Sequence, residues 1–441
     1  MKQHSRASTY PERLEMVAYT TAGAGDAAVA EQLGWSRWTV RKWRRRSQRH
    51  GNAALVRRMG RPQVGAAGSF PQTLRDEMLR MRTANPGWGP KTILVELQKD
   101  PCFARHKLPS RSTIAAFLQA QQKTRQYRRH THLQHANIQR GTYAHEEWEL
   151  DAKGAIKLPG LGRVCIINVL DTFSRVKTAS LAVGPTTKPR TEDYQLACRC
   201  AFMRFGLPDR ITLDHDVAFI ETTCPSPFPR RLHLWFIGLG IAVRFIEHPP
   251  PREHSLIERG HQTLVAQALT APSPSTLAAF NVQLGQRRVF LNYDYPSTVF
   301  GDLAPLQAHP QAAHPRRTYT PQLEAELLDL QRIDDYLAQH TWYRPVFKAG
   351  QFWIHRKCYN VGRQWAGHTL TIRFVPTTRS FVCTSETGEP SAVLDALGLA
   401  KADLMGELSP WQHMTTYQLH LPLSPPHLRE AALYREMAGT T

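Results

Sequence analysis

The chain has 441 residues, of which 41% are hydrophobic, and a formal net charge of +20 from 56 Lys and Arg against 36 Asp and Glu. This length predicts roughly two to four folding units, and the hydrophobic content excludes a wholly disordered chain. No apolar stretch approaches the ~20 residues of a membrane helix, the first residues lack the apolar core of a secretory signal, and seven scattered cysteines are typical of a reducing compartment, so we expect a cytoplasmic protein without disulfides.

The positive charge is concentrated in the first third of the chain. Residues 1–140 carry 26 Lys and Arg against 8 Asp and Glu, a net of +18, whereas residues 141–441 carry 30 against 28, a net of +2. A basic block beside a neutral body indicates a polyanionic partner, because each neutralised phosphate releases condensed counterions. The alternative is a solvated basic surface that only confers solubility.

Residues 12–46 show the pattern of a helix-turn-helix. Apolar residues at helical spacing predict helices over 12–22 and 26–33, and Gly34 ends the second of them. Ser36 is a favourable N-cap for a third helix, which is strongly basic. A basic helix in this position is expected to lie in the major groove of DNA.

The third of these helices has an apolar side and a basic side. Trp38, Val40 and Trp43 are expected to face inward. The residues expected to face outward, and to reach guanine edges or phosphates, are Arg37, Arg41, Lys42, Arg44 and Arg45. The alternative is an ordinary helical hairpin with a charged face.

A second helix-turn-helix pattern follows a short linker of small residues. One helix is predicted up to Thr83, a second over 91–99 after a turn rich in Pro and Gly, and a third over 108–119, with Ser110 or Ser112 as its N-cap. Two such modules joined by a linker can bind a longer DNA site than either module alone.

Residues 123–140 contain no acidic residue and are predicted to be an extended basic connector that follows a phosphate backbone. Arg128 and Arg129 are its expected DNA contacts. Three histidines in this stretch lack nearby cysteines or a fourth ligand, so a polar linker is favoured over a metal site.

From Glu147 the sequence changes to short runs rich in Val and Ile, which predict strands. The first three strands are expected over 147–154, 162–174 and 175–183. Further strands are expected over 211–214 and 241–246, and helices over 190–206, over 231–240 and from about His254. The order β-β-β-α-β-α-β-α predicts a mixed sheet with helices on both faces.

The motifs of this region resemble those of insertion-sequence transposases with an integrase catalytic core. The matching motifs, in order, are WELDAKG, NVLDTFSR, GLPDRITLDHDVAF, GLGIAVRFI and HSLIERGHQTL, within residues 146–300. Upstream, the run NPGWGPKTILVEL and the later LPSRSTIAAFL are similar to the second helix-turn-helix module of these enzymes. The resemblance implies a ribonuclease H-like fold and DDE transposase activity.

On this resemblance Asp151, Asp214 and Glu258 carry over as the catalytic and metal-binding triad, 63 and 44 positions apart. Phosphodiester chemistry uses such carboxylates to hold two divalent ions ~4 Å apart. Mg²⁺ prefers hard oxygen ligands, and Mn²⁺ is expected to substitute for it. Arg259 is expected to meet a phosphate or to pair with an acid, and His261 either contacts the scissile phosphate or packs on its helix.

Two positions depart from the family pattern. His215-Asp216 stands where members usually carry Asn-Gly after the second acid, and His254-Ser255 stands where they usually carry Asn-Gly before the glutamate. Asp216 adds a side chain and a charge where glycine normally lets the backbone pass close to DNA and metal. A further metal ligand, a tuned site and a damaged site are the alternatives. A nearby acid, Asp171, is expected to be a structural turn residue.

The last third is expected to hold helices and a small β-domain. Residues 321–337 predict one helix with Leu at helical spacing, and residues 347–390 predict five short strands with turns at glycine. The β-rich stretch resembles the SH3-like barrel that follows the catalytic core in many of these transposases. It is either a protein–protein module or a DNA-facing one lined by Arg356, Lys357, Arg363 and Arg373.

The sequence therefore predicts a multidomain α+β protein with tandem N-terminal helix-turn-helix modules, a ribonuclease H-like α/β core with a mixed sheet and a C-terminal SH3-like β-barrel. The expected boundaries are 1–60 and 71–122 for the modules, 61–70 for their linker, 123–145 for the basic connector, 146–300 for the core, 301–345 for a helical linker, 346–392 for the barrel and 393–441 for the tail.

The predicted function is DNA transposition: binding of element ends, cleavage by a metal-activated water and joining of the 3′ ends to target DNA. The expected partners are double-stranded DNA, as ends and as target, and further copies of the chain in a synaptic complex, with no membrane. Such a protein would associate with a bacterial nucleoid. The alternatives are a sequence-specific DNA-binding protein with a degenerate core and a structure-specific nuclease that cuts without joining.

Overall fold

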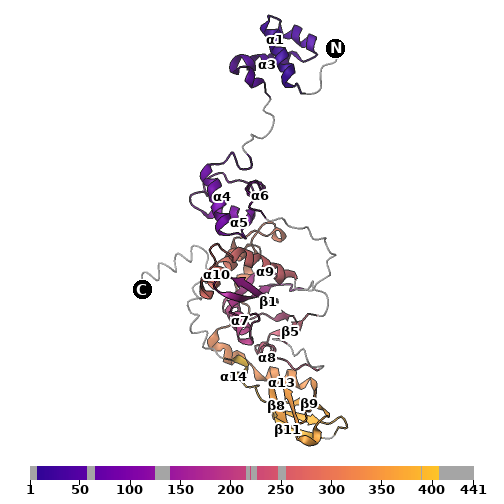
Figure 1. Ribbon diagram of the computed structural model, residues 1–441. Coiled ribbons are helices and arrows are strands. Elements are labelled where there is room, and N and C mark those ends of the chain that lie inside the picture. The colour runs from indigo at the N-terminus through magenta and orange to yellow at the C-terminus, as the bar shows by residue number, and fades with distance from the viewer. Residues whose placement is uncertain are drawn as a thin grey trace, which may run out of the picture. The chain divides into compact units, whose positions relative to one another are not determined.

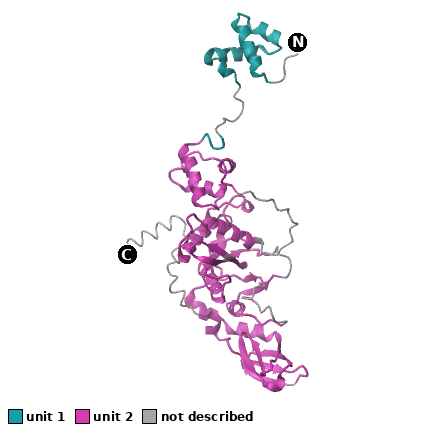
Figure 2. Ribbon diagram, in the orientation of Figure 1, with its two compact units in different colours: residues 1–69 teal, residues 70–441 magenta. Residues whose placement is uncertain are grey.

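The computed structural model describes residues 7–56, 65–124, 140–214, 219, 226–246, 255–388 and 390–406. The chain divides into two compact units, residues 1–69 and residues 70–441, each of which is described by itself (Figure 2). Within the described part, no helix combines the length and the apolar character needed to cross a bilayer.

The first unit holds three helices and a 3-10 turn: α1 (Tyr10–Thr21), α2 (Asp26–Leu33), α3 (Arg37–His50) and η1 (Asn52–Leu55). The predicted cap is present, because the Ser36 side chain accepts a hydrogen bond from the Thr39 backbone N–H at 3.1 Å. Gly34 ends α2 in the left-handed conformation, with φ of 69°. The helix-turn-helix predicted from the sequence is therefore confirmed in this unit.

One side chain of α3 corrects the prediction. Val40 and Trp43 are buried as expected, but Trp38 is 72% exposed. Residues two positions apart in an α-helix point about 200° away from each other, so Trp38 and Val40 lie on opposite sides. Trp38 belongs to the basic side of the helix, where the Arg41 guanidinium lies 5.7 Å from the centre of its ring.

The second unit begins with three further helices: α4 (Gln72–Ala84), α5 (Pro90–Lys99) and α6 (Arg111–Ala120). Of the two serines predicted to cap α6, Ser110 is the one that does so, since its side chain accepts a hydrogen bond from Thr113 N–H at 3.2 Å. The helices fall where the second helix-turn-helix pattern predicts them.

A five-stranded mixed sheet lies at the centre of the second unit. Its strands are β1 (Glu147–Leu158), β2 (Gly162–Asp171), β3 (Lys177–Val183), β4 (Arg210–Leu213) and β5 (Ala242–Phe245). Their order across the sheet is β3-β2-β1-β4-β5. β2 pairs antiparallel with β1 and β3, whereas β4 pairs parallel with β1 and β5.

Helices cover both faces of this sheet (Figure 1). They are α7 (Thr191–Phe205), α8 (Arg231–Gly238), α9 (Ser255–Ala268) and α10 (Leu277–Tyr293). Trp148 of β1 packs in one core with Phe202 of α7 and Trp235 of α8. Ile166 of β2 packs in another with Leu264 of α9. The order of strands and helices along the chain is the predicted one.

Helix α5 also packs into the core formed with α9 and α10, where Val95 is buried. Trp88, just before α5, donates its indole N–H to the Gln267 carbonyl of α9 at 3.1 Å. Glu96 pairs with Arg287 of α10 at 2.7 Å. The second helical module is therefore joined to the central sheet by a packed and hydrogen-bonded interface.

Short helices and turns follow: η2 (Thr298–Phe300), α11 (Pro305–Ala308), η3 (Pro310–Ala313), η4 (Pro321–Leu323), α12 (Glu324–Leu327) and α13 (Leu330–Ala338). The single helix predicted over 321–337 is thus divided. At the break, Asp329 N–H donates to the Gly238 carbonyl at 2.9 Å, and the Asp329 side chain caps α13. The long-range bond to Gly238 and the local cap replace the bonds that a continuous helix would make.

The last region is a β-domain of six strands: β6 (Thr341–Pro345), β7 (Gln351–Ile354), β8 (Lys357–Asn360), β9 (Thr369–Val375), β10 (Ser380–Thr384) and β11 (Pro390–Asp395). A 3-10 turn, η5 (Arg363–Trp365), precedes β9, and α14 (Lys401–Met405) follows β11. Four strands form one sheet in the order β11-β10-β9-β6, and β7 and β8 form a hairpin. β6 lies within residues 301–345, where a helical linker was predicted. Its buried residues, Trp342 and Arg344, alternate with more exposed ones, which is the period of a strand and not of a helix.

Candidate functional site

β1 carries three carboxylates on one face of the sheet: Glu147, Glu149 and Asp151. Every second residue of a strand points to the same face, and the intervening Trp148 and Leu150 are buried in the opposite core. Glu147 and Glu149 are almost fully buried, whereas the Asp151 side chain is 23% exposed. Asp151 is therefore the member of this set that a ligand can reach from solvent.

The second predicted acid follows the neighbouring strand. In the parallel pairing of β1 and β4, Glu149 lies opposite Thr212. Asp214 directly follows β4, two residues after Thr212, so an extension of the same register beyond the strand would put it level with Asp151. Asp214 is partly exposed. Two carboxylates from adjacent parallel strands provide the hard oxygen donors that Mg²⁺ prefers.

His261 of α9 orients Asp151. Its Nε2 atom lies 3.0 Å from Asp151 Oδ2, and its Nδ1 atom is hydrogen-bonded to Nδ2 of Asn168, which lies opposite Asp151 on β2. Because the amide nitrogen donates, Nδ1 accepts and the ring proton sits on Nε2, which is buried and contacts the carboxylate without the geometry of a hydrogen bond. The two roles expected for His261 were contact with a phosphate and packing on its helix. Its burial agrees with packing, and its contact with Asp151 was not predicted.

Both carboxylate oxygens of Asp151 have partners within the chain. A carboxylate has about four lone-pair sites, and Asp151 uses Oδ1 to accept from Ala152 N–H at 2.8 Å and Oδ2 toward His261. Glu258 and Arg259 are both exposed in the first turns of α9. Among the described residues, no three Asp, Glu, His or Cys side chains gather closely enough to hold a metal ion. The two aspartates fit an oxygen-liganded ion, while Glu258 is not grouped with them.

The start of α9 is tied to the buried part of β1. Ile257 N–H donates to the Glu149 carboxylate at 3.1 Å. Burial raises the pKa of Glu149 to about 7, an effect that this hydrogen bond partly offsets. Glu147 accepts from Thr212 Oγ1 at 2.5 Å and from Arg244 Nε at 3.0 Å. These two glutamates therefore fix α9, β4 and β5 relative to the strand that carries Asp151.

Asp171, at the end of β2, has the structural role expected of it. Its side chain is fully buried, and its Oδ2 accepts from Ser174 N–H at 3.0 Å while Oδ1 accepts from His145 N–H at 3.2 Å. Burial raises its pKa to about 6. The carboxylate closes the turn between β2 and β3 and is not open to a ligand.

The basic side of α3 is the candidate DNA-binding surface of the first unit. Lys42 and Arg45 are exposed and, together with Arg49, line a groove of about 700 Å³. Arg44 differs, because it forms two hydrogen bonds with the Asp26 carboxylate of α2, at 2.7 and 2.9 Å. These bonds lower the pKa of Asp26. Arg44 thus holds α3 against α2 and is engaged within the protein.

The other predicted contacts are placed as follows. Arg37 is exposed, and Arg41 is half-buried beside Trp38. Arg128 and Arg129 lie outside the described residues, as do His215, Asp216 and His254.

Sequence reasoning missed Asn168 and Glu149, although both left a signal. Asn168 is a polar residue inside the apolar run of β2, and the text WELD places carboxylates with period two on one strand. The link between Asn168 and His261 joins positions 93 residues apart, so it depends on how α9 packs over the sheet.

Part of the chain is similar in structure to retroviral integrases. A chain of the simian T-cell lymphotropic virus intasome, in complex with PP2A regulatory subunit B56 gamma, is 16% identical with a TM-score of 0.33, over 70% of this chain and 98% of that one. The HTLV-2 integrase catalytic core domain in complex with magnesium is 17% identical with a TM-score of 0.30, over 38% and 99%. The catalytic core domain of BIV integrase is 16% identical with a TM-score of 0.28, over 38% and 96%.

The first unit has a family match of its own. Residues 8–56 match the family of the homeodomain-like domain. The matched range spans α1, α2 and α3, including the Ser36 cap and the basic side of α3. Residues 8–56 are therefore a homeodomain-like helix-turn-helix domain.

Proposed function

We propose that this chain is an insertion-sequence DDE transposase, which binds the ends of a mobile DNA element, cleaves them and joins the 3′ ends to target DNA. The observation that supports this proposal is that Asp151 lies on β1, that Asp214 directly follows β4, the parallel neighbour of β1, and that α9, which bears Glu258, packs against β1. The motif resemblance gives these acids their roles, and the homeodomain-like domain accounts for DNA binding.

In this proposal Asp151, Asp214 and Glu258 hold two divalent ions, Mg²⁺ or Mn²⁺. When bound, such ions would supply activation of the attacking oxygen and stabilisation of the leaving oxygen. His261 contacts Asp151 through Nε2 and is hydrogen-bonded to Asn168 of β2 through Nδ1, which ties α9 to the two strands beside the site. Arg259, exposed beside Glu258, contacts a DNA phosphate through its guanidinium.

The reaction has two steps in one site. A water first attacks the phosphodiester at the element end and frees a 3′ hydroxyl. That hydroxyl then attacks a phosphodiester of the target DNA. The second attack forms a new phosphodiester and releases a 3′ hydroxyl of the target strand. Because the nucleophiles are water and then a DNA hydroxyl, no covalent bond to the protein forms. Two ends must be joined in concert, so we propose that the chain acts as a homo-oligomer on two ends and one target, with the β-domain as an SH3-like barrel in that assembly.

The test is incubation of the purified protein with element-end DNA and Mg²⁺ or Mn²⁺. End cleavage and joining are expected, and Asp214→Ala or Glu258→Gln should abolish both while end binding stays mostly intact. Tight, specific binding without cleavage or joining would overturn the enzyme assignment. If Asp216→Ala is inactive and Asp214→Ala is not, the second acid is Asp216.

A second candidate is a sequence-specific DNA-binding protein with a degenerate core. Two observations favour it: the departures at His215-Asp216 and His254-Ser255, and the absence of a three-ligand metal cluster among the described residues. If this candidate is correct, Asp214→Ala leaves end binding unchanged. The unaltered protein then cleaves no DNA with either Mg²⁺ or Mn²⁺.

A further inference from the structure

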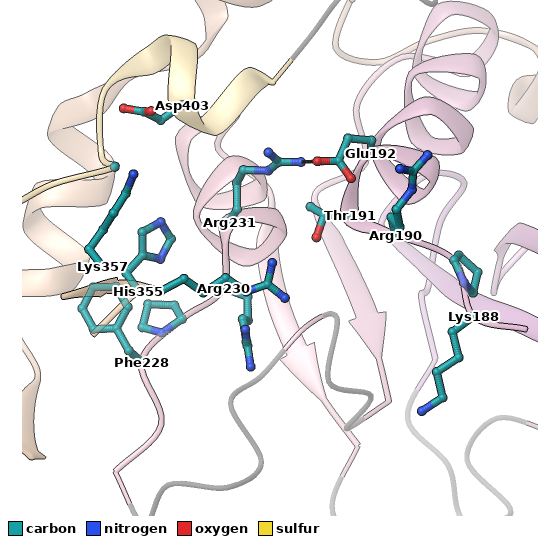
Figure 3. A pocket seen from close by; sticks show the side chains of 14 residues that line it. Lys188, Arg190, Thr191, Glu192, Phe228, Arg230, Arg231, His355, Lys357 and Asp403 are labelled. Atoms are coloured by element: carbon teal, nitrogen blue, oxygen red, sulfur yellow. Dashed lines mark hydrogen bonds and ion pairs between the residues drawn. The ribbon is translucent and has the colours of Figure 1, made fainter. Parts of the chain in front are cut away.

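A cleft of about 670 Å³ lies in the second unit, away from the carboxylates of β1 and β4. Its walls are the segment that leads into α7, the start of α8 and the turn of the β7–β8 hairpin (Figure 3). The side chains of Lys188 and Arg190 lie on one side, and those of Arg230, His355 and Lys357 on the other (Figure 3).

The cleft is strongly basic. Two of its described lining residues are carboxylates, Glu192 and Asp403, and six are cationic: Lys188, Arg190, Arg230, Arg231, Arg356 and Lys357. The sum, 6 minus 2, is +4. Residues 141–441 together carry only 30 minus 28, or +2. The cleft lining is therefore more positive in net charge than the whole of residues 141–441, although it holds only six of their 30 Lys and Arg.

Most of these cations are open to solvent. Lys188, Arg190, Arg356 and Lys357 are exposed. Arg231 is the exception, because it pairs with Glu192 inside the cleft. The ion pair of Arg190 with Asp193 is long, at 4.0 Å, and the Arg190 side chain is 82% exposed. Exposed cations in one cleft repel each other unless an anion lies between them.

The hairpin turn adds an independent observation. Ile354 pairs with Lys357, so His355 and Arg356 form a two-residue turn. Both have positive φ, 50° and 61°, the conformation for which such turns normally use Asn-Gly. Residues with side chains that keep this rare conformation are concentrated at functional sites. Here the turn places a histidine and an arginine on the wall of the cleft.

The topology places the cleft at the edge of the sheet where the candidate reaction centre lies. β1, β3 and β4 run in the same direction, since β2 is antiparallel to both β1 and β3, and β4 is parallel to β1. α7 connects β3 to β4, and α8 connects β4 to β5, so both helices begin at the edge where these strands end. Asp214 directly follows β4 at that edge. Ligands of open α/β sheets bind beyond this edge.

The lining favours a phosphate backbone over a nucleobase. Phe228 supplies the only benzene ring among the described lining residues. It is 1% exposed, and its ring lies 4.7 Å from that of Trp342 in the core of the β-domain. A base needs an exposed aromatic face on which to stack, and the cleft offers none in its described lining. Lys and Arg bind phosphate oxygens through charge-assisted hydrogen bonds.

We infer that this cleft binds the phosphodiester backbone of a DNA segment that extends past the sheet edge from the reaction centre. The inference rests on the proposed function for the identity of the DNA. A free polyphosphate could bind the same cations through its phosphate oxygens. We favour a DNA backbone because the exposed cations lie on two separate walls, where a continuous strand of phosphates can contact both.

The test uses the full chain and a random-sequence DNA duplex. Arg356→Glu combined with Lys357→Glu changes the hairpin wall, and Lys188→Glu combined with Arg190→Glu changes the opposite wall. The matched control is Lys157→Glu combined with Arg163→Glu, a cross-strand pair of exposed cations on β1 and β2 outside the cleft, with the same change of charge. Fluorescence anisotropy between 50 and 200 mM salt gives affinity and salt dependence.

Each cleft variant should bind the duplex about tenfold more weakly than the control, with a salt slope smaller by about 2. Cleft variants that bind like the control overturn the inference. If inorganic triphosphate binds the unaltered protein and the cleft variants lose only that binding, the ligand is a free polyphosphate, and the DNA assignment is wrong. A protein that never cleaves element ends, but whose cleft variants lose duplex binding, contradicts the proposed function and supports the cleft.

Discussion

In the first unit, α3 presents Lys42 and Arg45 to solvent, whereas in the second unit Arg199 and Glu324 are 3% and 0% exposed and lie 2.6 Å apart. The same residue types thus have different physical roles. Exposed cations cost little to maintain and remain free to bind a polyanion, with an affinity that salt weakens. Buried charges cost free energy unless they are paired, and in return they fix the elements that carry them.

In the second helical module, two cations of α5 are paired with carboxylates although their ion pairs lie near the surface. Its sequence resembles a DNA-reading module, yet Lys91 of α5 lies 3.2 Å from Asp302, and Lys99 is hydrogen-bonded to Asp294. The cations that α5 would need for DNA are already paired with Asp302 and Asp294, which follow α10. The two helix-turn-helix patterns thus form similar sets of helices, but Lys42 and Arg45 of α3 face solvent whereas Lys91 and Lys99 of α5 are paired with carboxylates.

The largest expected effect is the loss of the buried ion pair. Arg199→Met leaves Glu324 buried without its cation, although Trp235 Nε1 still donates to it at 2.9 Å. The free energy of unfolding should fall by about 3–5 kcal/mol, measured by urea denaturation. The control is Arg80→Ala, which removes an exposed partner of Glu77 and should cost less than about 1 kcal/mol. Equal losses would contradict the distinction between exposed and buried charge.

The next effect concerns pH and Glu149. Its folded pKa of about 7 lies above the ordinary value of 4.5, so the folded protein keeps a proton that the unfolded chain releases. The free energy of unfolding therefore falls as pH rises between these values, by up to about 3 kcal/mol. Glu149→Gln keeps an acceptor for Ile257 N–H but has no charge.

Urea denaturation in metal-free buffer should show this variant gaining stability over the unaltered protein as pH rises from about 5 to about 7.5, by about 2–3 kcal/mol. A difference that stays constant over this range would show that Glu149 is ionised in the folded state like an exposed glutamate.

A smaller effect tests the docking of the second module. A Cβ added at Gly87 would lie 1.7 Å from the Ala266 carbonyl oxygen of α9. Gly87→Ala should therefore lower the free energy of unfolding by about 1–3 kcal/mol, since the backbone must shift. Gly285→Ala, in α10 with open space around it, should raise it by about 0.5–1 kcal/mol. If both substitutions raise it, the module is not packed on α9.

The smallest effect is on salt dependence. Lys42→Ala combined with Arg45→Ala should reduce the salt slope of element-end binding by about 2, because two phosphate contacts are lost. Lys91→Ala combined with Lys99→Ala removes the same charge from paired positions and should leave the slope unchanged. Filter binding over a salt series gives both values, and equal slopes for the two double variants would place α5 on the DNA.

The local features of the fold could be predicted from the sequence because local signals determine them. The Ser36 cap, the glycine at the end of α2 and the apolar run of β2 each act within a few residues. The division of the 321–337 helix depends instead on a bond between Asp329 and Gly238, which no local pattern reveals.

The sequence predicts the acids of the candidate site but not their partners. Asp151 and Asp214 follow from motif and register, whereas the contact of His261 with Asp151 requires α9 to lie over the sheet. Arg44 was expected on DNA, and its ion pair with Asp26 depends on how α3 packs on α2. The exposure of a charged side chain is decided by tertiary packing, which sequence periodicity describes only in part.

The most direct test of the account is single-turnover cleavage of a pre-bound element end by Asp151→Asn, with end occupancy measured in the same samples. The account predicts unchanged occupancy and a cleavage rate lower by at least about 10³-fold, since a metal-binding carboxylate contributes several kcal/mol. The matched control, Asp395→Asn at the exposed end of β11, should cleave normally. Cleavage by Asp151→Asn within about tenfold of the unaltered protein would contradict the account.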